Sequence, residues 1–330
     1  MSERDSIGLP QEKERPSSTK SSSSSSCLHI LLDSIKIISR NKQIFFPIFA
    51  LLALPLSLHL FSVSFVSLPL KSHIHHLESV ALYSASRFEA RQIWKESRES
   101  AISLLRLKAL FFLPSFILSL LAAISSVSST AAAGITSQRP NLRSALTAIR
   151  QTWHRPALTT IFIYAVSLSY FNVPRVLAVV IGGGSHLLRF LIWVILSGLD
   201  VYLMAVMGMG LVVSITEERF GWEAIRVGSG LMEGRRLCGW MLSGLMVLIS
   251  GVIGWKMERF LIMAIDRQDP SNWWTSVKVV VGGSDRFVLV CLYGFVVVWS
   301  YAIATVYYCE CRKRHVVRVE DNGVEELVPV

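Results

Sequence analysis

Charged side chains are missing from four long stretches of this 330-residue chain. No Asp, Glu, Lys or Arg occurs between Lys42 and Lys71, Lys108 and Arg139, Arg236 and Lys256, or Arg286 and Glu310. Soluble domains rarely combine uncharged runs of this length with 52% hydrophobic residues and a mean hydropathy of +0.49. The lack of charge therefore excludes a soluble fold with a single membrane tail.

Cysteine is also scarce, and its spacing matches no common kind of site. The chain has five cysteines, which form no Cys-x-x-Cys pair and no disulfide framework: Cys27, Cys238, Cys291, Cys309 and Cys311. Cys309 and Cys311 lie at the end of the last apolar stretch, where S-palmitoylation is one interpretation. We favour the alternative, two unreactive thiols at the edge of the bilayer.

Motifs for catalysis, metal binding and nucleotide binding are missing as well. The glycine run 182–184 lacks the strand and helix that flank a phosphate-binding loop, so a tight hairpin turn explains it. His73, His75 and His76 have no Cys or carboxylate partner at metal-ligand spacing. No serine can be matched with a catalytic base and acid. We therefore expect no enzymatic activity, no cofactor and no metal site.

Six long apolar stretches are what the chain does contain. They cover residues 44–66, 109–133, 158–181, 190–213, 237–255 and 287–308. A helix needs about 20 residues to cross a hydrocarbon core of ~30 Å, and it satisfies its own backbone hydrogen bonds in lipid. The sequence thus predicts an all-α fold, a polytopic transmembrane helical bundle of six spans, with one membrane domain over residues 27–311.

The segments outside the spans differ in composition. Residues 1–26 hold ten serines and no apolar periodicity, which predicts a disordered tail, and residues 312–330 form a C-terminal tail. Amphipathic segments precede the first, third and fifth spans, at 28–42, 139–155 and 216–236. We interpret them as interfacial elbow helices in a weak threefold repeat, in which each elbow is followed by a helical hairpin.

The basic residues indicate how the chain lies in the membrane. The net charge is +10, and six spans would put 19 of the 33 Lys and Arg residues on the side of the termini, against 14 on the other. The positive-inside rule then places both termini in the cytosol. Basic residues beside spans favour anionic lipid, so we expect the lipid bilayer as partner and no nucleic acid. The expected location is the endoplasmic reticulum, another endomembrane or the plasma membrane.

Two stretches resemble a known family. The first runs from Gly221 to Arg236 and contains Gly-Trp-Glu-Ala-Ile-Arg-Val-Gly-Ser-Gly-Leu-Met-Glu-Gly-Arg-Arg. The second, residues 305–313, reads Thr-Val-Tyr-Tyr-Cys-Glu-Cys-Arg-Lys. Together with Asn41-Lys42 before the Phe-Phe-Pro at 45–47, they are similar to an uncharacterised family of plant membrane proteins with six helices.

The resemblance extends over most of residues 28–315 and implies a fold without implying a site. The family has no known activity, substrate or catalytic residue, so none is transferred to this chain. Gly228 stands where the family usually has serine. The plan of elbows and hairpins is more distantly similar to the membrane domain attached to bacterial glycerophosphodiester phosphodiesterases. Their catalytic barrel has no counterpart, because the soluble segments here are too short to form one.

Asp200 is the strongest candidate for a functional side chain. It lies near the middle of the fourth span, where insertion scales assign an acidic residue a cost of ~2.5–3.5 kcal/mol. A turn after the third span would bring Arg175 near it. The polar residues that could complete a cluster are Tyr170, Asn172 and Tyr202. We favour an Asp200–Arg175 pair that locks the bundle, and the alternative is a proton- or ligand-coupled site.

These observations favour a membrane scaffold or a lipid-interacting protein as the function. The alternative is a transporter of ions or small molecules with a mid-membrane site around Asp200. An intramembrane enzyme fits least, because no two catalytic groups share a depth in the membrane. Small residues spaced four apart, such as Ala122 and Ser126, permit close helix contacts within the bundle, in a homo-oligomer or with other membrane proteins.

Overall fold

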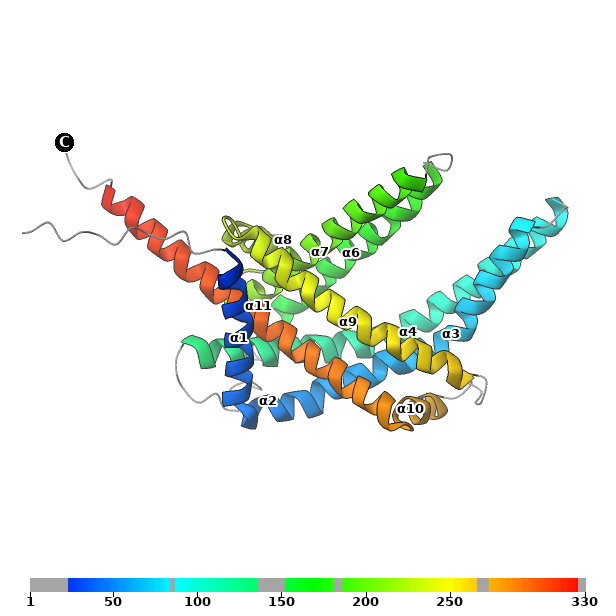
Figure 1. The fold of residues 1–330 in the computed structure, drawn as a ribbon, viewed down its shortest axis with the longest axis horizontal. Coiled ribbons are helices and arrows are strands. Elements are labelled where there is room, and N and C mark those ends of the chain that lie inside the picture. The colour runs from blue at the N-terminus through cyan, green and yellow to red at the C-terminus, as the bar shows by residue number, and fades with distance from the viewer. Residues whose placement is uncertain (1–22, 84–86, 136–151, 181–185, 266–272, 326–330) are drawn as a thin grey trace, which may run out of the picture.

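A computed structural model describes residues 23–83, 87–135, 152–180, 186–265 and 273–325 (Figure 1). All regular secondary structure in these residues is helical. The elements are α1 (Ser23–Arg40), α2 (Lys42–Ile48), the π-helix η1 (Phe49–Ala53), α3 (Leu54–Tyr83), α4 (Arg87–Ile135), α6 (His154–Val180), α7 (His186–Thr216), α8 (Gly221–Leu231), α9 (Arg236–Ile265), α10 (Trp273–Val281) and α11 (Ser284–Glu325). The predicted all-α class is confirmed.

Five helical segments are long and apolar enough to cross a membrane. They are Lys42–Ala81, Arg91–Ala133, Phe190–Thr216, Arg236–Ala264 and Ser284–His315. They contain five of the six predicted apolar stretches, so the structure is that of an integral membrane protein. The 27-residue helix α6 covers the third predicted span but is not one of these five. The sixth span therefore stays a prediction.

The long helices form three antiparallel pairs that turn at the same end of the molecule. In Figure 1, α3 with α4, α6 with α7, and α9 with α11 all turn towards the right-hand side, while α1, α8 and the end of α11 lie towards the left. We call the left-hand side the terminal end and the right-hand side the hairpin end. The α3–α4 and α6–α7 pairs diverge towards the hairpin end, and α9 and α11 cross them.

The α3–α4 hairpin is longer than a membrane is thick. Helix α4 has 49 residues, which at 1.5 Å per residue is about 73 Å, against a hydrocarbon core of about 30 Å. The charged segment 72–107, between the first two predicted spans, consists largely of the continuations of α3 and α4. The spans therefore continue as a helical hairpin beyond their apolar parts.

Helices occur at two of the three predicted elbows. Helix α1 begins at Ser23, so its first turn includes the last four residues of the segment predicted as a tail. Helix α8 lies within the elbow predicted at 216–236. The elbow predicted at 139–155 falls mainly on residues 136–151, which are outside the described part of the chain, as are residues 1–22 of the predicted tail. α11 continues helically to Glu325, through most of the predicted C-terminal tail.

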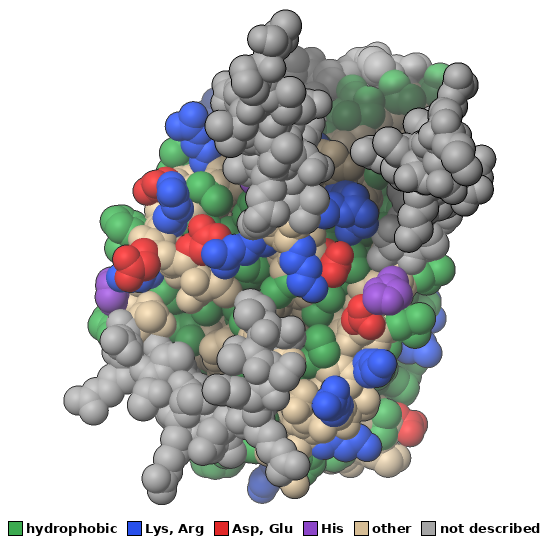
Figure 2. All heavy atoms as spheres, turned by 90° about the vertical axis from the view of Figure 1, so that its left-hand side faces the viewer, with side chains coloured by type: hydrophobic (Ala, Val, Ile, Leu, Met, Phe, Trp, Pro, Cys, Tyr) green, Lys and Arg blue, Asp and Glu red, His purple; other side chains and the backbone are tan. Residues whose placement is uncertain are grey.

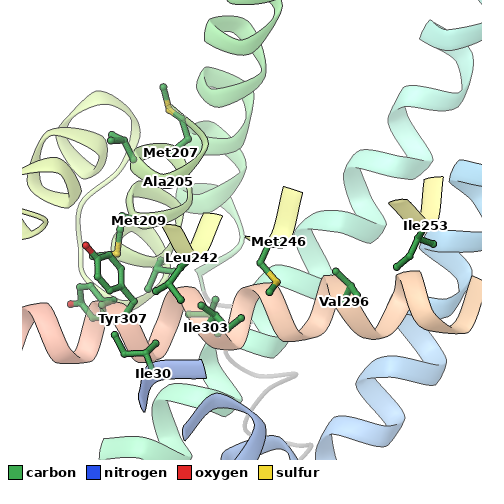
Figure 3. Packing of buried hydrophobic residues seen from close by; sticks show 14 of the residues in the cluster. Ile30, Ala205, Met207, Met209, Leu242, Met246, Ile253, Val296, Ile303 and Tyr307 are labelled. Carbon is green, nitrogen blue, oxygen red and sulfur yellow. The ribbon is translucent and has the colours of Figure 1, made fainter. Parts of the chain in front are cut away.

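The core follows α11 through the molecule. Figure 3 shows Val296, Ile303 and Tyr307 along this helix, with Ile30 of α1 on one side and Leu242 of α9 beside Tyr307. The same cluster also contains buried side chains of α3, α4, α7, α8, α9 and α10. α11 is therefore the common partner against which the other helices are placed.

The first span contains a local break in its α-helical pattern. Pro47 and Pro55 flank the π-helix η1, and proline lacks the N–H that an α-helical hydrogen bond requires. Here Gly294 of α11 approaches the backbone closely: a Cβ on Gly294 would lie 3.3 Å from the Ala53 carbonyl oxygen. The absence of a side chain at position 294 lets the two helices touch.

Candidate functional site

Asp200 lies on α7 at intermediate burial, near the middle of the helix. No ion pair to its carboxylate occurs among the side chains that the structure describes. Arg175 and Asn172 belong to α6, but their side chains are outside the described part of the chain. The predicted Asp200–Arg175 pair therefore stays a prediction.

The other predicted members of the Asp200 cluster have partners of their own. Tyr202 packs against the central core cluster. Residues two apart on a helix point about 200° apart, because each residue turns the helix by about 100°, so Tyr202 and Asp200 occupy nearly opposite faces of α7. The Tyr170 hydroxyl donates a hydrogen bond to the Leu196 carbonyl oxygen at 2.6 Å.

A second donor reaches the same part of α7 from the other side. The Trp240 indole N–H donates to the Gly198 carbonyl oxygen at 2.9 Å, so α9 is tied to α7 about half a turn before Asp200. Tyr170 and Trp240 thus fix the backbone of α7 from α6 and α9 respectively. These contacts position α7, and they do not surround Asp200 with a ligand site.

Several polar contacts connect helices at the terminal end. The Tyr308 hydroxyl of α11 donates to the Glu217 carboxylate at 2.6 Å, and the Arg312 guanidinium donates to the Tyr308 oxygen at 3.2 Å. One residue earlier, the Tyr307 hydroxyl donates to the Arg235 carbonyl oxygen at 3.0 Å. Figure 2 shows this face of the molecule, on which Lys and Arg side chains gather among acidic ones. Two consecutive tyrosines therefore join α11 to the residue after α7 and to the residue before α9.

Helix α8 is packed directly onto the α7 backbone. A Cβ added to Gly228 would lie 3.0 Å from the Gly210 backbone nitrogen and 3.2 Å from the Met209 carbonyl carbon. At the start of α8, the Gly221 N–H donates to the Thr159 hydroxyl of α6 at 2.9 Å, and Gly221 itself has a φ of 61° that favours glycine. The close contact thus gives a packing reason for glycine at position 228.

Four of the five cysteines occupy two places at the terminal end. Cys27 of α1 and Cys238 of α9 form a disulfide with their Cα atoms 5.8 Å apart, a pairing that the sequence spacing did not indicate. Cys309 is half-buried, whereas Cys311 is 4% exposed and belongs to the core cluster. Acylation of Cys311 would therefore require local repacking, which leaves Cys309 as the more accessible of the two predicted palmitoylation sites.

A cavity of about 470 Å³ lies between α9 and the start of α11. Its lining joins charged and apolar side chains: Trp255, Lys256, Arg259, Phe260, Met263, Asp285, Val288 and Leu289. The Arg259 guanidinium lies over the Trp255 ring, 4.2 Å from its centroid, at the distance of a cation–π contact. Sequence reasoning missed this site, although the basic Lys256 and Arg259 follow the fifth predicted span directly.

The histidines after the first span do not converge. The His75 imidazole lies 3.7 Å from the Glu78 carboxylate, whereas His73 lies 3.5 Å from the Ser100 hydroxyl of α4. Within the described ranges, no group of three His, Cys, Asp or Glu residues is arranged to hold a metal ion.

Comparison with known proteins connects the chain to one family. A family model described as a domain of unknown function, DUF8558, matches residues 24–327, which include every helix described above except the first residue of α1. Comparisons with curated proteins and with solved structures each found no match. Because the family model covers most of the chain, the protein belongs to the DUF8558 family.

Proposed function

We propose that this chain is a non-enzymatic integral membrane protein that organises lipid around splayed helical hairpins. In this proposal α6 is the sixth span, and α1 and α8 are elbow helices in the interface at the terminal end. An even number of spans agrees with the position of α1 and of the end of α11 on the same side of the molecule (Figure 1). The basic residues near the ends of α8 and α11 favour the cytosol for that side.

The observation that supports the proposal is how little of the spans is buried against protein. Between 17% and 39% of each apolar window is buried, and α7 has the lowest share. The first half of α7 exposes Leu187, Phe190 and Trp193 by 79%, 64% and 65%. In a membrane these surfaces contact acyl chains, so the α6–α7 hairpin depends on lipid for much of its packing.

Hydrogen exchange tests this dependence directly. We expect exchange in residues 187–199 of α7 to slow when the detergent-purified, delipidated protein is placed in lipid nanodiscs. Residues 296–307 of α11 serve as the internal control, because they pack against protein and should change little. The proposal would be contradicted if α7 exchanged at the same rate in the delipidated protein in detergent as in nanodiscs, and if no phospholipid co-purified with the protein.

A transporter with a site at Asp200 is the second candidate, because an acidic side chain at mid-membrane commonly marks a transport path. The low burial of α7 argues against it, since a path needs an enclosing wall of protein. Asp200→Cys in a cysteine-free background, probed from each side with a membrane-impermeant thiol reagent, separates the two functions. We expect no labelling in folded protein, whereas labelling would establish an aqueous path and favour the transporter.

A further inference from the structure

We propose that the cavity between α9 and α11 binds one phospholipid, with the phosphate between Lys256 and Arg259 and an acyl chain along Trp255, Val288 and Leu289. This inference rests on the proposed lipid-organising function and names a specific site and ligand class for it.

The cavity lies at the border between hydrocarbon and headgroups. The uncharged part of α9 runs from Leu237 to Trp255, which at 1.5 Å per residue is about 28 Å, close to the thickness of a hydrocarbon core. Lys256 is the first charged residue after it. On α11, Asp285 and Arg286 come just before the uncharged stretch that begins at Phe287. Both walls therefore change from apolar to charged at the cavity.

The lining has an apolar zone from the uncharged stretches of both helices and a pair of cations beyond it, and the apolar Phe260 and Met263 lie further along α9. Val288 and Leu289 come from the uncharged stretch of α11, and Trp255 is the last uncharged residue of the α9 run. Lys256 and Arg259 follow on α9, three residues apart and thus on one side of the helix. An acyl chain and a phosphate placed in these two zones would each meet matching chemistry.

The charge of the lining favours an anion. Lys256 and Arg259 give two positive charges against one negative charge from Asp285. Both cationic side chains are exposed, and neither takes part in the ion pairs of the described residues. The Asp285 carboxylate already accepts a 3.4 Å hydrogen bond from Ser284 and can accept another from a headgroup hydroxyl or ammonium. Arg286 is held elsewhere, because it donates to the Val279 carbonyl oxygen of α10.

Native mass spectrometry of the full-length, delipidated protein tests the site with phosphatidylglycerol and phosphatidylcholine as probes. Each basic group at an anionic lipid surface contributes on the order of a fivefold gain in affinity, so Lys256→Gln/Arg259→Gln should weaken phosphatidylglycerol binding by about 25-fold. The matched control, Lys36→Gln/Arg40→Gln, removes two cations from α1 at the opposite end of the molecule and should leave this affinity within about twofold.

A second variant separates a cavity from a charged surface. Val288→Trp keeps all charges and fills the apolar part, and since Val288 is exposed, the substitution leaves the core intact. We expect it to weaken binding of both lipids, and we expect inorganic phosphate not to compete.

Three outcomes would overturn the proposal: equal loss in the two double variants, unchanged binding in Val288→Trp, or displacement of the lipid by inorganic phosphate. If the site fails while α7 still requires lipid for its protection from exchange, only this proposal is lost and the general function remains. If hydrogen exchange of α7 did not depend on lipid, the proposed lipid-organising function would be refuted instead.

Discussion

The close contact between α7 and α8 makes a quantitative prediction about Gly228. Any side chain at this position meets backbone atoms of α7 at 3.0 to 3.3 Å, and backbone cannot rotate away as a side chain can. Overpacking of this kind costs about 1–3 kcal/mol, because the helices must separate or bend. Gly228→Ala should therefore loosen α8 from α7, and Gly228→Ser should do so to a similar extent.

Gly230 provides the matched control two residues along the same helix. A Cβ there would meet nothing within 4 Å, so Gly230→Ala adds the same methyl group without a clash. Both alanine variants gain roughly the same ~1 kcal/mol of helix propensity, which cancels when the two are compared. The remaining difference is the overpacking energy alone.

Hydrogen exchange of residues 221–231 in nanodiscs measures that difference. An overpacking energy of about 1–3 kcal/mol corresponds to roughly 5- to 150-fold faster exchange through local opening in Gly228→Ala than in Gly230→Ala. Circular dichroism should show the same helix content in both variants. Equal exchange rates in the two variants would refute the reasoning, because the contact with Gly210 would then exert no constraint.

Two further predictions concern the terminal end. Tyr308→Phe removes the donor to the Glu217 carboxylate and should lower the free energy of unfolding by about 1.5–3 kcal/mol, as expected for a hydrogen bond to a charged group. Adding Glu217→Gln to this variant should lower it by little more. If the effects of the two substitutions are fully additive, the two residues are not coupled. Hydroxylamine-sensitive acyl exchange tests palmitoylation. Because Cys309 is more exposed than Cys311, we expect the exchange signal to be lost in Cys309→Ser and kept in Cys311→Ser. No signal in the unsubstituted protein would refute palmitoylation at either site.

Local pattern in the sequence was enough to predict the helices. Long apolar stretches predicted the long helices, and the helices exceed these stretches mostly at their ends, as with α7, which covers 186–216 where 190–213 was predicted. Helix geometry alone could also have separated Tyr202 from Asp200, since the two residues are two positions apart. The packing of the half-buried Tyr202 against the core cluster agrees with that geometry.

Contacts between distant segments were not predictable in the same way. Glu217 and Tyr308 are 91 residues apart, and hydropathy does not indicate which spans are neighbours. The Tyr307-Tyr308 stretch was noticed only through the family resemblance, without a partner. The α9–α11 cavity depends on where two helices lie side by side, which one sequence does not contain. The divergence of the α6–α7 hairpin has the same origin, because it follows from packing rather than from periodicity.

The disulfide between Cys27 and Cys238 and the basic residues assign opposite environments to the terminal end. Disulfides persist in oxidising compartments, whereas an excess of Lys and Arg marks the cytosolic, reducing side. The packing of α1 against α9 brings the two thiols together whether or not they are bonded. Because the terminal end is proposed to face the reducing cytosol, we expect Cys27 and Cys238 to be free thiols in cells and to form the disulfide when an oxidant is added.

Lysis of the cells directly into denaturant that contains excess maleimide, followed by counting of labelled thiols, measures the state of the pair, because denaturation also exposes the buried cysteines. Five labelled cysteines are expected before oxidation and three after it, the latter being Cys291, Cys309 and Cys311. In Cys27→Ser, four should be labelled under both conditions, which identifies the pair. Three labelled thiols in untreated cells would mean that the terminal end faces an oxidising compartment, and the cytosolic orientation of both tails would then be reversed.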